Sequence, residues 1–199
     1  VYEEKNMSLT QDFRKVYESL LNALYPDYPY GTQTVLGSQE HLKNPSITNI
    51  KKYFKTWYVP NNMAICMSGD LNPDETIKII NKYFGEMKAN PNLPERPQHK
   101  ESPIKEPVVK EVVGLDAESV ALAWRMPTTV DDEIVSSLIS SILYNGQAGL
   151  LDVNLNQQQK VLGCFAGSLG LSDYYTYMIS GQPKQGQTLD EVKDLMLAE

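Results

Sequence analysis

The stretch from Ser46 to Gly85 constrains this chain most, because it has the pattern of helix, turn, buried strand, turn and helix. Ser46 can cap the first helix, and Asn72-Pro73-Asp74-Glu75 supplies the capping signals of the second. Between them, Met63 to Met67 is a continuous apolar run, which predicts a strand covered on both faces. The first helix has an apolar face at helical spacing, formed by Ile47, Ile50, Tyr53, Phe54 and Trp57.

The predicted strand at 63–67 has no obvious partner in the sequence. A strand buried on both faces needs hydrogen-bonded neighbours, and residues 1–60 supply no clear candidate for one. We therefore expect the chain to be an internal fragment of a larger protein, with the partner strands upstream. A stand-alone α+β binding module is the alternative, and the unpartnered strand argues against it.

Residues 1–42 are expected to be mostly helix and loop. An amphipathic pattern runs to Leu24, and Ser8 to Gln11 either caps a fresh helix or marks a bend in an earlier one. The aromatic, proline-rich loop from Tyr25 to Gly31 either packs over the core or lines a site. A short helix is predicted from Gly37 to Leu42.

The character of the sequence changes after Gly85. Residues 88–107 carry five prolines without periodicity, which predicts a semi-extended linker. The elements that follow predict an antiparallel sheet with helices on one face. In order, they are strands at 108–113 and 119–124, a helix from Thr129, a shorter helix at 149–158, strands at 161–170 and 174–180, and a helix capped by Thr188.

Composition excludes some functions. There are 18 basic and 25 acidic residues and the net charge is −7, which argues against a nucleic-acid-binding surface. No run of 18 apolar residues occurs, so no transmembrane segment is predicted. Cys66 and Cys164 lie in apolar runs, which favours buried reduced thiols over a disulfide or a catalytic thiol. The compartment is not readable from the sequence.

Catalytic patterns are scarce in this sequence. No carboxylate stands at a metal-like spacing from His41 or His99, so neither is expected to be a ligand. Ala166 to Gly170 fails the nucleophile-elbow pattern, because alanine replaces the first glycine. The adjacent acids Glu3 and Glu4 point about 100° apart on a helix, so at most one faces a given partner. The chain by itself is expected to catalyse nothing.

An ordered series of short motifs nevertheless resembles a known family. The motifs are Tyr2-Glu3-Glu4-Lys5-Asn6, Pro29-Tyr30-Gly31, Leu36-Gly37, Tyr58-Val59-Pro60-Asn61-Asn62-Met63, Ser68-Gly69-Asp70 and Tyr83-Phe84-Gly85. They are similar to the second half of the first lobe of the pitrilysin/insulinase family, inverted zinc metallopeptidases that include the mitochondrial processing peptidases. The resemblance implies an α+β fold of two-layer α/β sandwich lobes. Residues 1–87 would end one lobe, 88–107 would be the linker, and 108–199 would begin the next lobe.

The resemblance also implies a function. In this family two histidines of an H-x-x-E-H motif and a later glutamate bind zinc, and the resemblance places that glutamate on Glu4, with Glu3 as the alternative. No H-x-x-E-H occurs here. The longer protein is expected to be a zinc-dependent metalloendopeptidase acting on peptides or unfolded polypeptides, paired with a second homologous half or subunit. This chain alone is not expected to bind zinc tightly. The alternative is a non-catalytic homologue or scaffold subunit of the family.

Overall fold

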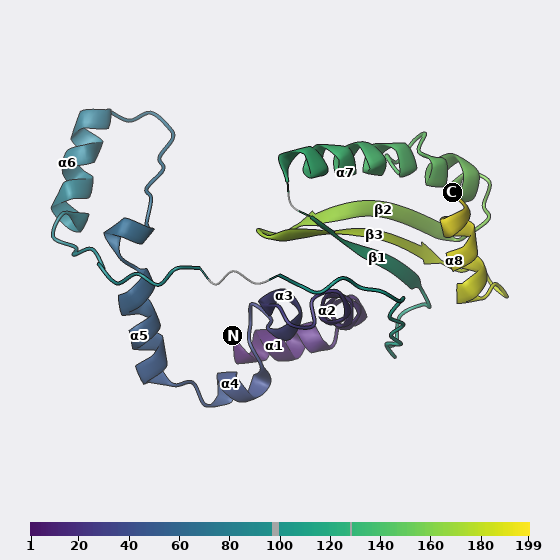
Figure 1. The fold of residues 1–199 in the computed structure, drawn as a ribbon, viewed down its shortest axis with the longest axis horizontal. Coiled ribbons are helices and arrows are strands. Elements are labelled where there is room, and N and C mark those ends of the chain that lie inside the picture. The colour runs from purple at the N-terminus through teal and green to yellow at the C-terminus, as the bar shows by residue number, and fades with distance from the viewer. Residues whose placement is uncertain (97–99, 128) are drawn as a thin grey trace. The chain divides into compact units, whose positions relative to one another are not determined.

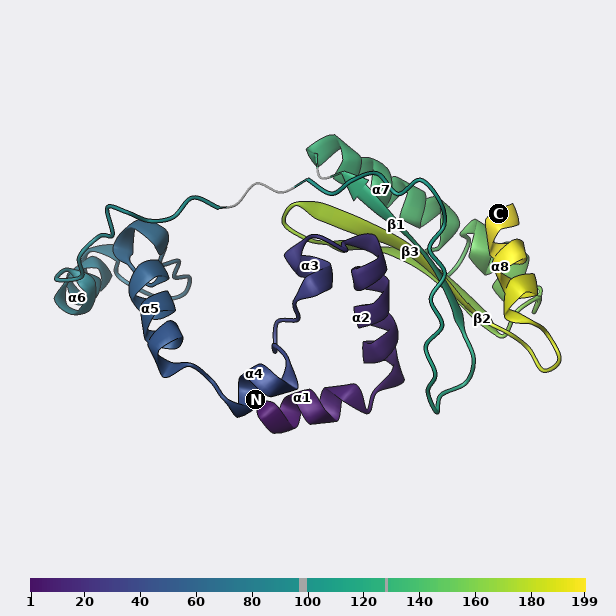
Figure 2. The same cartoon turned by 60° about the horizontal axis from the view of Figure 1, so that its bottom comes forward.

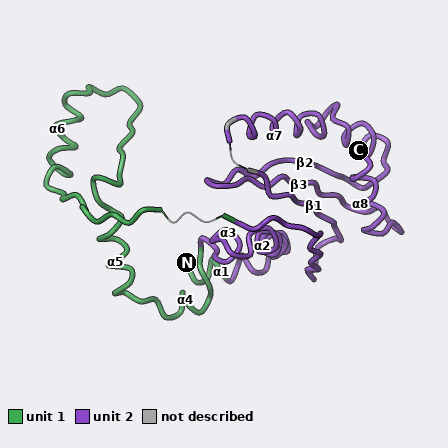
Figure 3. Tube along the Cα trace, in the orientation of Figure 1, with its two compact units in different colours: residues 1–5, 36–100 green, residues 6–35, 101–199 purple. Residues whose placement is uncertain are grey.

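The computed structural model describes residues 1–96, 100–127 and 129–199. It divides into two compact units, each of which draws on separate parts of the chain (Figure 3). Unit 1 comprises residues 1–5 and 36–100, and unit 2 comprises residues 6–35 and 101–199. Helix α1 (Tyr2–Leu9) contains one of the boundaries between them.

Unit 2 is built on a three-stranded antiparallel sheet with the order β1-β3-β2. The strands are β1 (Val120–Pro127), β2 (Gly163–Gly170) and β3 (Tyr174–Gln182). The predicted pairing of the last two strands is confirmed. The predicted strand at 108–113 is wrong, because the segment has no ladder partner among the residues that the structure describes. The carboxylate of Asp12 accepts from the amides of Leu115 and Asp116, where a hairpin turn was expected.

Helices that follow β1 in the chain cover one face of this sheet, as the sequence predicts (Figures 1 and 2). They are α7 (Val130–Leu143), the π-helical turn η2 (Asp152–Asn156) and α8 (Leu189–Ala198). Thr129 caps α7 by accepting from the amide of Asp132, and Thr188 forms the predicted capping box with Glu191. The buried core between these helices and the sheet consists of Leu151, Leu155, Val161, Cys164, Ala166, Tyr177, Ile179, Val192 and Met196.

The opposite face of the sheet packs against helices from the N-terminal part of the chain. These are α2 (Asp12–Leu24) and the short α3 (Pro29–Thr32). α2 is a separate helix from α1, so the sequence between them starts a fresh helix, although no side chain caps it. Tyr25 is fully buried, and its hydroxyl lies 2.9 Å from that of Thr176 on β3. The aromatic loop therefore packs over the core.

A buried ion pair fixes Glu101, which lies within the predicted linker at 88–107, to the rest of unit 2. The carboxylate of Glu101 lies 3.4 Å from the guanidinium group of Arg125, and these side chains are only 1% and 9% exposed. Glu101 accepts from the amide of Asp27 at 3.1 Å, and its own amide donates to the Tyr174 hydroxyl at 2.9 Å. Arg125 also donates to the carbonyl of Leu24 at 2.6 Å. Both charges thus have the partners that burial requires.

Unit 1 contains the predicted helices on either side of the apolar run. They are α4 (Gln39–Lys43), α5 (Ile47–Trp57), the 3-10 turn η1 (Pro60–Asn62) and α6 (Pro73–Phe84). The hydroxyl of Ser46 accepts from the amide of Asn49 at 3.3 Å, and Asn72 accepts from the amides of Asp74 and Glu75. These contacts confirm both predicted caps.

The apolar run at 63–67 is not a strand, so the prediction of a strand buried on both faces is wrong. Met63, Ile65 and Met67 are 41%, 47% and 60% exposed. The described part of unit 1 contains no strand that could pair with the run, and an unpaired backbone cannot form a ladder. None of the described helices has the length and apolar character needed to cross a membrane.

Candidate metal-ligand site

Helix α1 carries Glu3 and Glu4, the two carboxylates that the sequence singles out. Both side chains are exposed. The Glu4 carboxylate lies 3.4 Å from the amino group of Val1 and is 69% exposed. An ion pair between groups this solvated contributes little and does not hold the carboxylate in one orientation. Glu4 is therefore accessible to a ligand.

Helix α4 contacts the first turn of α1 within unit 1. The ammonium group of Lys43 lies 5.5 Å from the centroid of the Tyr2 ring, a cation–π contact. His41, also on α4, is exposed, and its amide donates to the hydroxyl of Ser38. The other histidine, His99, lies outside the described residues.

The described residues do not by themselves fit a zinc ion. Catalytic zinc takes three protein ligands and keeps one open position. Across residues 1–96, 100–127 and 129–199, no group of three or more histidine, cysteine, aspartate or glutamate side chains is arranged to hold a metal. Glu4 supplies one anionic oxygen ligand at most, so its assignment as a zinc ligand stays a prediction.

The two cysteines differ in environment. Cys164 is buried in the core of unit 2, and burial, with the nearby negative charges of Asp152 and Glu199, raises the pKa of its thiol to about 11. A thiol with so high a pKa is a poor nucleophile at neutral pH. Cys66 is exposed on the unpaired apolar run, so burial is confirmed for Cys164 and wrong for Cys66. Both are free thiols.

Some polar contacts of unit 2 join residues that no sequence motif connects. The hydroxyls of Tyr28 and Tyr30 both donate to the carboxylate of Asp173, in the turn between β2 and β3. Asp152 accepts three backbone N–H groups from the loop after α7. For the Asp152 contacts, the sequence offers one indication, the turn-forming residues Asn145-Gly146 followed by Gly149.

The structure thus defines an α+β protein with an antiparallel sheet and packed helices, in which Glu4, the predicted metal ligand, is exposed. Residues 46–199 match the family model described as the Peptidase M16 inactive domain. The chain belongs to the M16 peptidase family. The resemblance to pitrilysin and its relatives is confirmed, as is the α+β fold class.

Individual relatives agree with this assignment. The chain is 26% identical over 179 residues to "Zinc protease PqqE" of Helicobacter pylori, covering 84% of this chain and 39% of that protein. A crystal structure of a protease from Helicobacter pylori superposes with a TM-score of 0.77 at 20% identity, over 99% of this chain and 49% of that one. Pitrilysin superposes with a TM-score of 0.66 at 18% identity, over 98% of this chain and 22% of its own. The chain thus spans half or less of each of these relatives.

Proposed function

We propose that this chain is part of a zinc-dependent metalloendopeptidase that hydrolyses peptides or unfolded polypeptides. The observation that carries the proposal is the similarity to "Zinc protease PqqE", which extends over 84% of the chain. In this proposal the chain contributes scaffold and one zinc ligand. Because the described residues offer no complete ligand set, the remaining ligands would come from residues outside this sequence.

The proposed zinc ligand is Glu4. Its position in the motif Tyr2-Glu3-Glu4-Lys5-Asn6 supports the assignment, as do its exposure and its place on a helix. A carboxylate is a suitable third ligand beside two neutral imidazoles, because it lowers the charge of the site and leaves a position open for water. Glu3, one residue away, points about 100° from it.

The proposal also covers the arrangement of the whole protein. Residues 1–87 and 108–199 would belong to successive lobes joined by the linker at 88–107, and a second homologous half or subunit would complete the enclosure for a peptide substrate. Coverage of only 22% of the pitrilysin chain supports this, since that relative contains several times as much sequence.

The test compares two neighbouring carboxylates in the longer protein. Glu4→Gln is expected to lose bound zinc and peptide hydrolysis together, because the amide removes the anionic ligand. Glu3→Gln is the matched control and should retain both. Zinc is measured by mass spectrometry of the purified protein, and hydrolysis with an unfolded polypeptide. Retention of zinc by both variants would exclude this role for either glutamate. The 199-residue chain alone should contain no stoichiometric zinc.

A second candidate function is that of a non-catalytic partner subunit. It is favoured by the description of the matching model as an inactive domain and by the lack of an H-x-x-E-H motif in this sequence. The same preparations distinguish the two functions. A partner subunit would hydrolyse no peptide by itself and would raise the activity of a homologous subunit, whether or not Glu4 is intact.

A further inference from the structure

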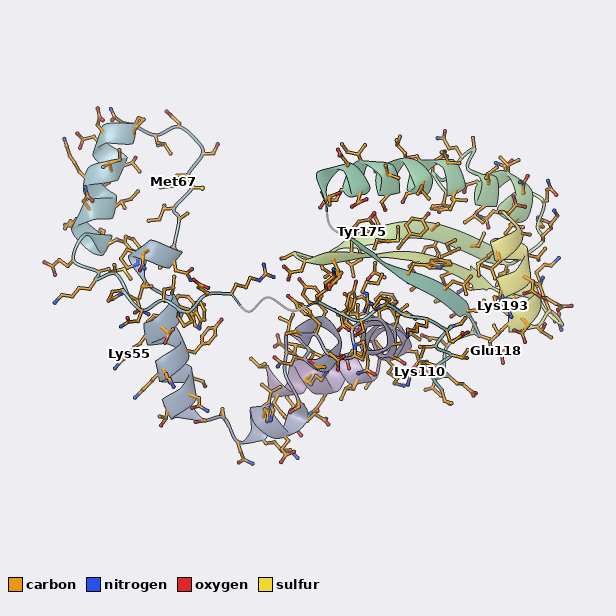
Figure 4. All side chains as sticks on the ribbon, in the orientation of Figure 1. Lys55, Met67, Lys110, Glu118, Tyr175 and Lys193 are labelled. Atoms are coloured by element: carbon orange, nitrogen blue, oxygen red, sulfur yellow. The ribbon has the colours of Figure 1, made fainter. Side chains whose placement is uncertain are left out.

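A groove rich in lysine lies on unit 1, far in sequence from Glu4. It is formed between α5 and the segment 88–91, and its volume is about 640 Å³. Lys51, Lys52 and Lys55 line it from the helix, and Lys88 lines it from the segment. Figure 4 labels Lys55 on α5. Among the described residues, no acidic side chain lines the groove.

Both walls of this groove are held together by hydrogen bonds. The side-chain amide of Asn90 donates to the carbonyl of Thr56 at 3.2 Å. The Asn61 side chain makes a reciprocal pair with the backbone of Asn90, accepting from its amide at 2.9 Å and donating to its carbonyl at 2.8 Å. The segment 88–91 is therefore fixed beside the end of α5.

The lysines of this groove have no anionic partner in the described part of the chain. None of their four ammonium groups makes an ion pair or a hydrogen bond there, whereas Lys78 pairs with Glu75 and Lys193 with Asp190. Positive charges grouped without a partner repel one another. The chain as a whole has a net charge of −7, so the groove is a local region of positive charge on an acidic protein.

The orientation of α5 keeps these lysines accessible. At 100° per residue, Lys52 and Lys55 lie on the side of the helix away from the apolar face of Ile50 and Phe54. Lys51 lies at the border of that face, about 60° from Phe54. A neighbouring domain that covers the apolar face would therefore leave the lysine side exposed to solvent.

We propose that the groove binds an extended acidic peptide segment. Lys51 and Lys55 are one helical turn apart, so they are separated by about 6 Å along the axis. Alternate side chains of an extended peptide lie about 6.6 Å apart on one face, so two alternate carboxylates can reach both lysines, while Lys88 faces them from the other wall. A nucleic acid is disfavoured, because its continuous phosphate charge would be repelled by the acidic remainder of the chain. The inference does not depend on zinc or on Glu4.

The test uses the full chain and a fluorescent octapeptide in which glutamate alternates with alanine. Anisotropy should show saturable binding that weakens with added salt, whereas the peptide with glutamine in place of glutamate should not bind. The double variant Lys51→Gln/Lys55→Gln should lower the affinity roughly tenfold, given a few-fold loss for each exposed charge contact. Asn61→Ala should also weaken binding without any change in charge, because it removes both hydrogen bonds to the backbone of Asn90 that hold the segment 88–91.

The matched control removes two lysines outside the groove. Lys78→Gln/Lys193→Gln changes the net charge equally and should leave the affinity unchanged. Equal losses in the two double variants would mean that only net charge matters and would overturn the proposal. Equal binding of the glutamine peptide, or tighter binding of a short DNA duplex than of the acidic peptide, would also overturn it. Circular dichroism checks that each variant keeps its helices.

Discussion

Asp152 shows how a single residue organises a loop in this protein. Its carboxylate accepts the amides of Asn145, Gly146 and Gly149 at 3.0, 2.9 and 3.1 Å. Burial tends to raise the pKa of this carboxyl, but the three backbone donors more than offset it, so the pKa lies below its ordinary value. The ionised form therefore stabilises the turn between α7 and η2.

The stability contributed by Asp152 should depend on pH. Because its folded pKa is lowered, the contribution is present above the unfolded pKa of about 3.9 and is lost as the pH falls through the folded value. Asp152→Ala should cost about 1–3 kcal/mol at pH 7, since three amides lose their acceptor. Urea unfolding at pH 7, 5 and 3 should show the difference shrinking only at the lowest pH. Asp194→Ala, at an exposed site, is the control, and a pH-independent difference would contradict the assignment.

At the scale of elements, α8 lies close to the sheet because β3 has a glycine beneath it. A Cβ atom at Gly181 would lie 2.6 Å from Val192 Cγ1 and 2.8 Å from Met196 Sδ. Both of these α8 side chains are almost fully buried. The close approach of helix and strand thus requires the absence of a side chain at this one position.

Gly181→Ala is therefore expected to destabilise unit 2. The added methyl group must displace α8, and overpacking of this kind costs about 1–3 kcal/mol. Gly163→Ala on β2 is the matched control, because a Cβ there meets nothing within 4 Å. Urea unfolding of both variants is the measurement. If the two substitutions have equal effects, α8 does not pack on Gly181 as described.

At the scale of the whole molecule, unit 1 exposes many large apolar side chains, and grouped apolar exposure of this kind marks an interaction surface. The exposed side chains include Ile47, Ile50, Tyr53, Phe54, Met63, Ile65, Met67, Ile77, Tyr83 and Phe84. They come from α5, the unpaired run and α6. In the proposed longer protein, sequence outside this chain would be available to cover them, since the curated relative is more than twice as long as the matched region.

The 199-residue chain alone should consequently bind an apolar dye and self-associate. Phe54→Lys should reduce both properties in this chain, because it places a charge within the exposed face of α5. Val109→Lys changes an exposed apolar residue in unit 2 and should have little effect. Dye fluorescence and sedimentation velocity measure the two properties. In the longer protein, Phe54→Lys should instead lower the unfolding temperature, and unchanged dye binding in the chain alone would refute the role of α5.

The sequence by itself determined features whose interacting groups lie within a few residues of one another. The caps at Ser46, Asn72 and Thr188 are confirmed, because each side chain binds an amide two or three residues ahead. The pairing of β2 with β3 was also predictable, since a short turn joins them. The ordered motifs identified the family, and with it the α+β fold.

Only the tertiary structure decided the features that depend on distant partners. The runs at 63–67 and 108–113 have the composition of strands, but no described residue pairs with them, so neither forms a ladder. The Glu101–Arg125 pair and the groove beside α5 join segments that are 24 and more than 30 residues apart, and no local pattern encodes them. The role of Glu4 also depends on distant partners. The motif resemblance assigns it as a zinc ligand, but a metal site requires several ligands brought together in space.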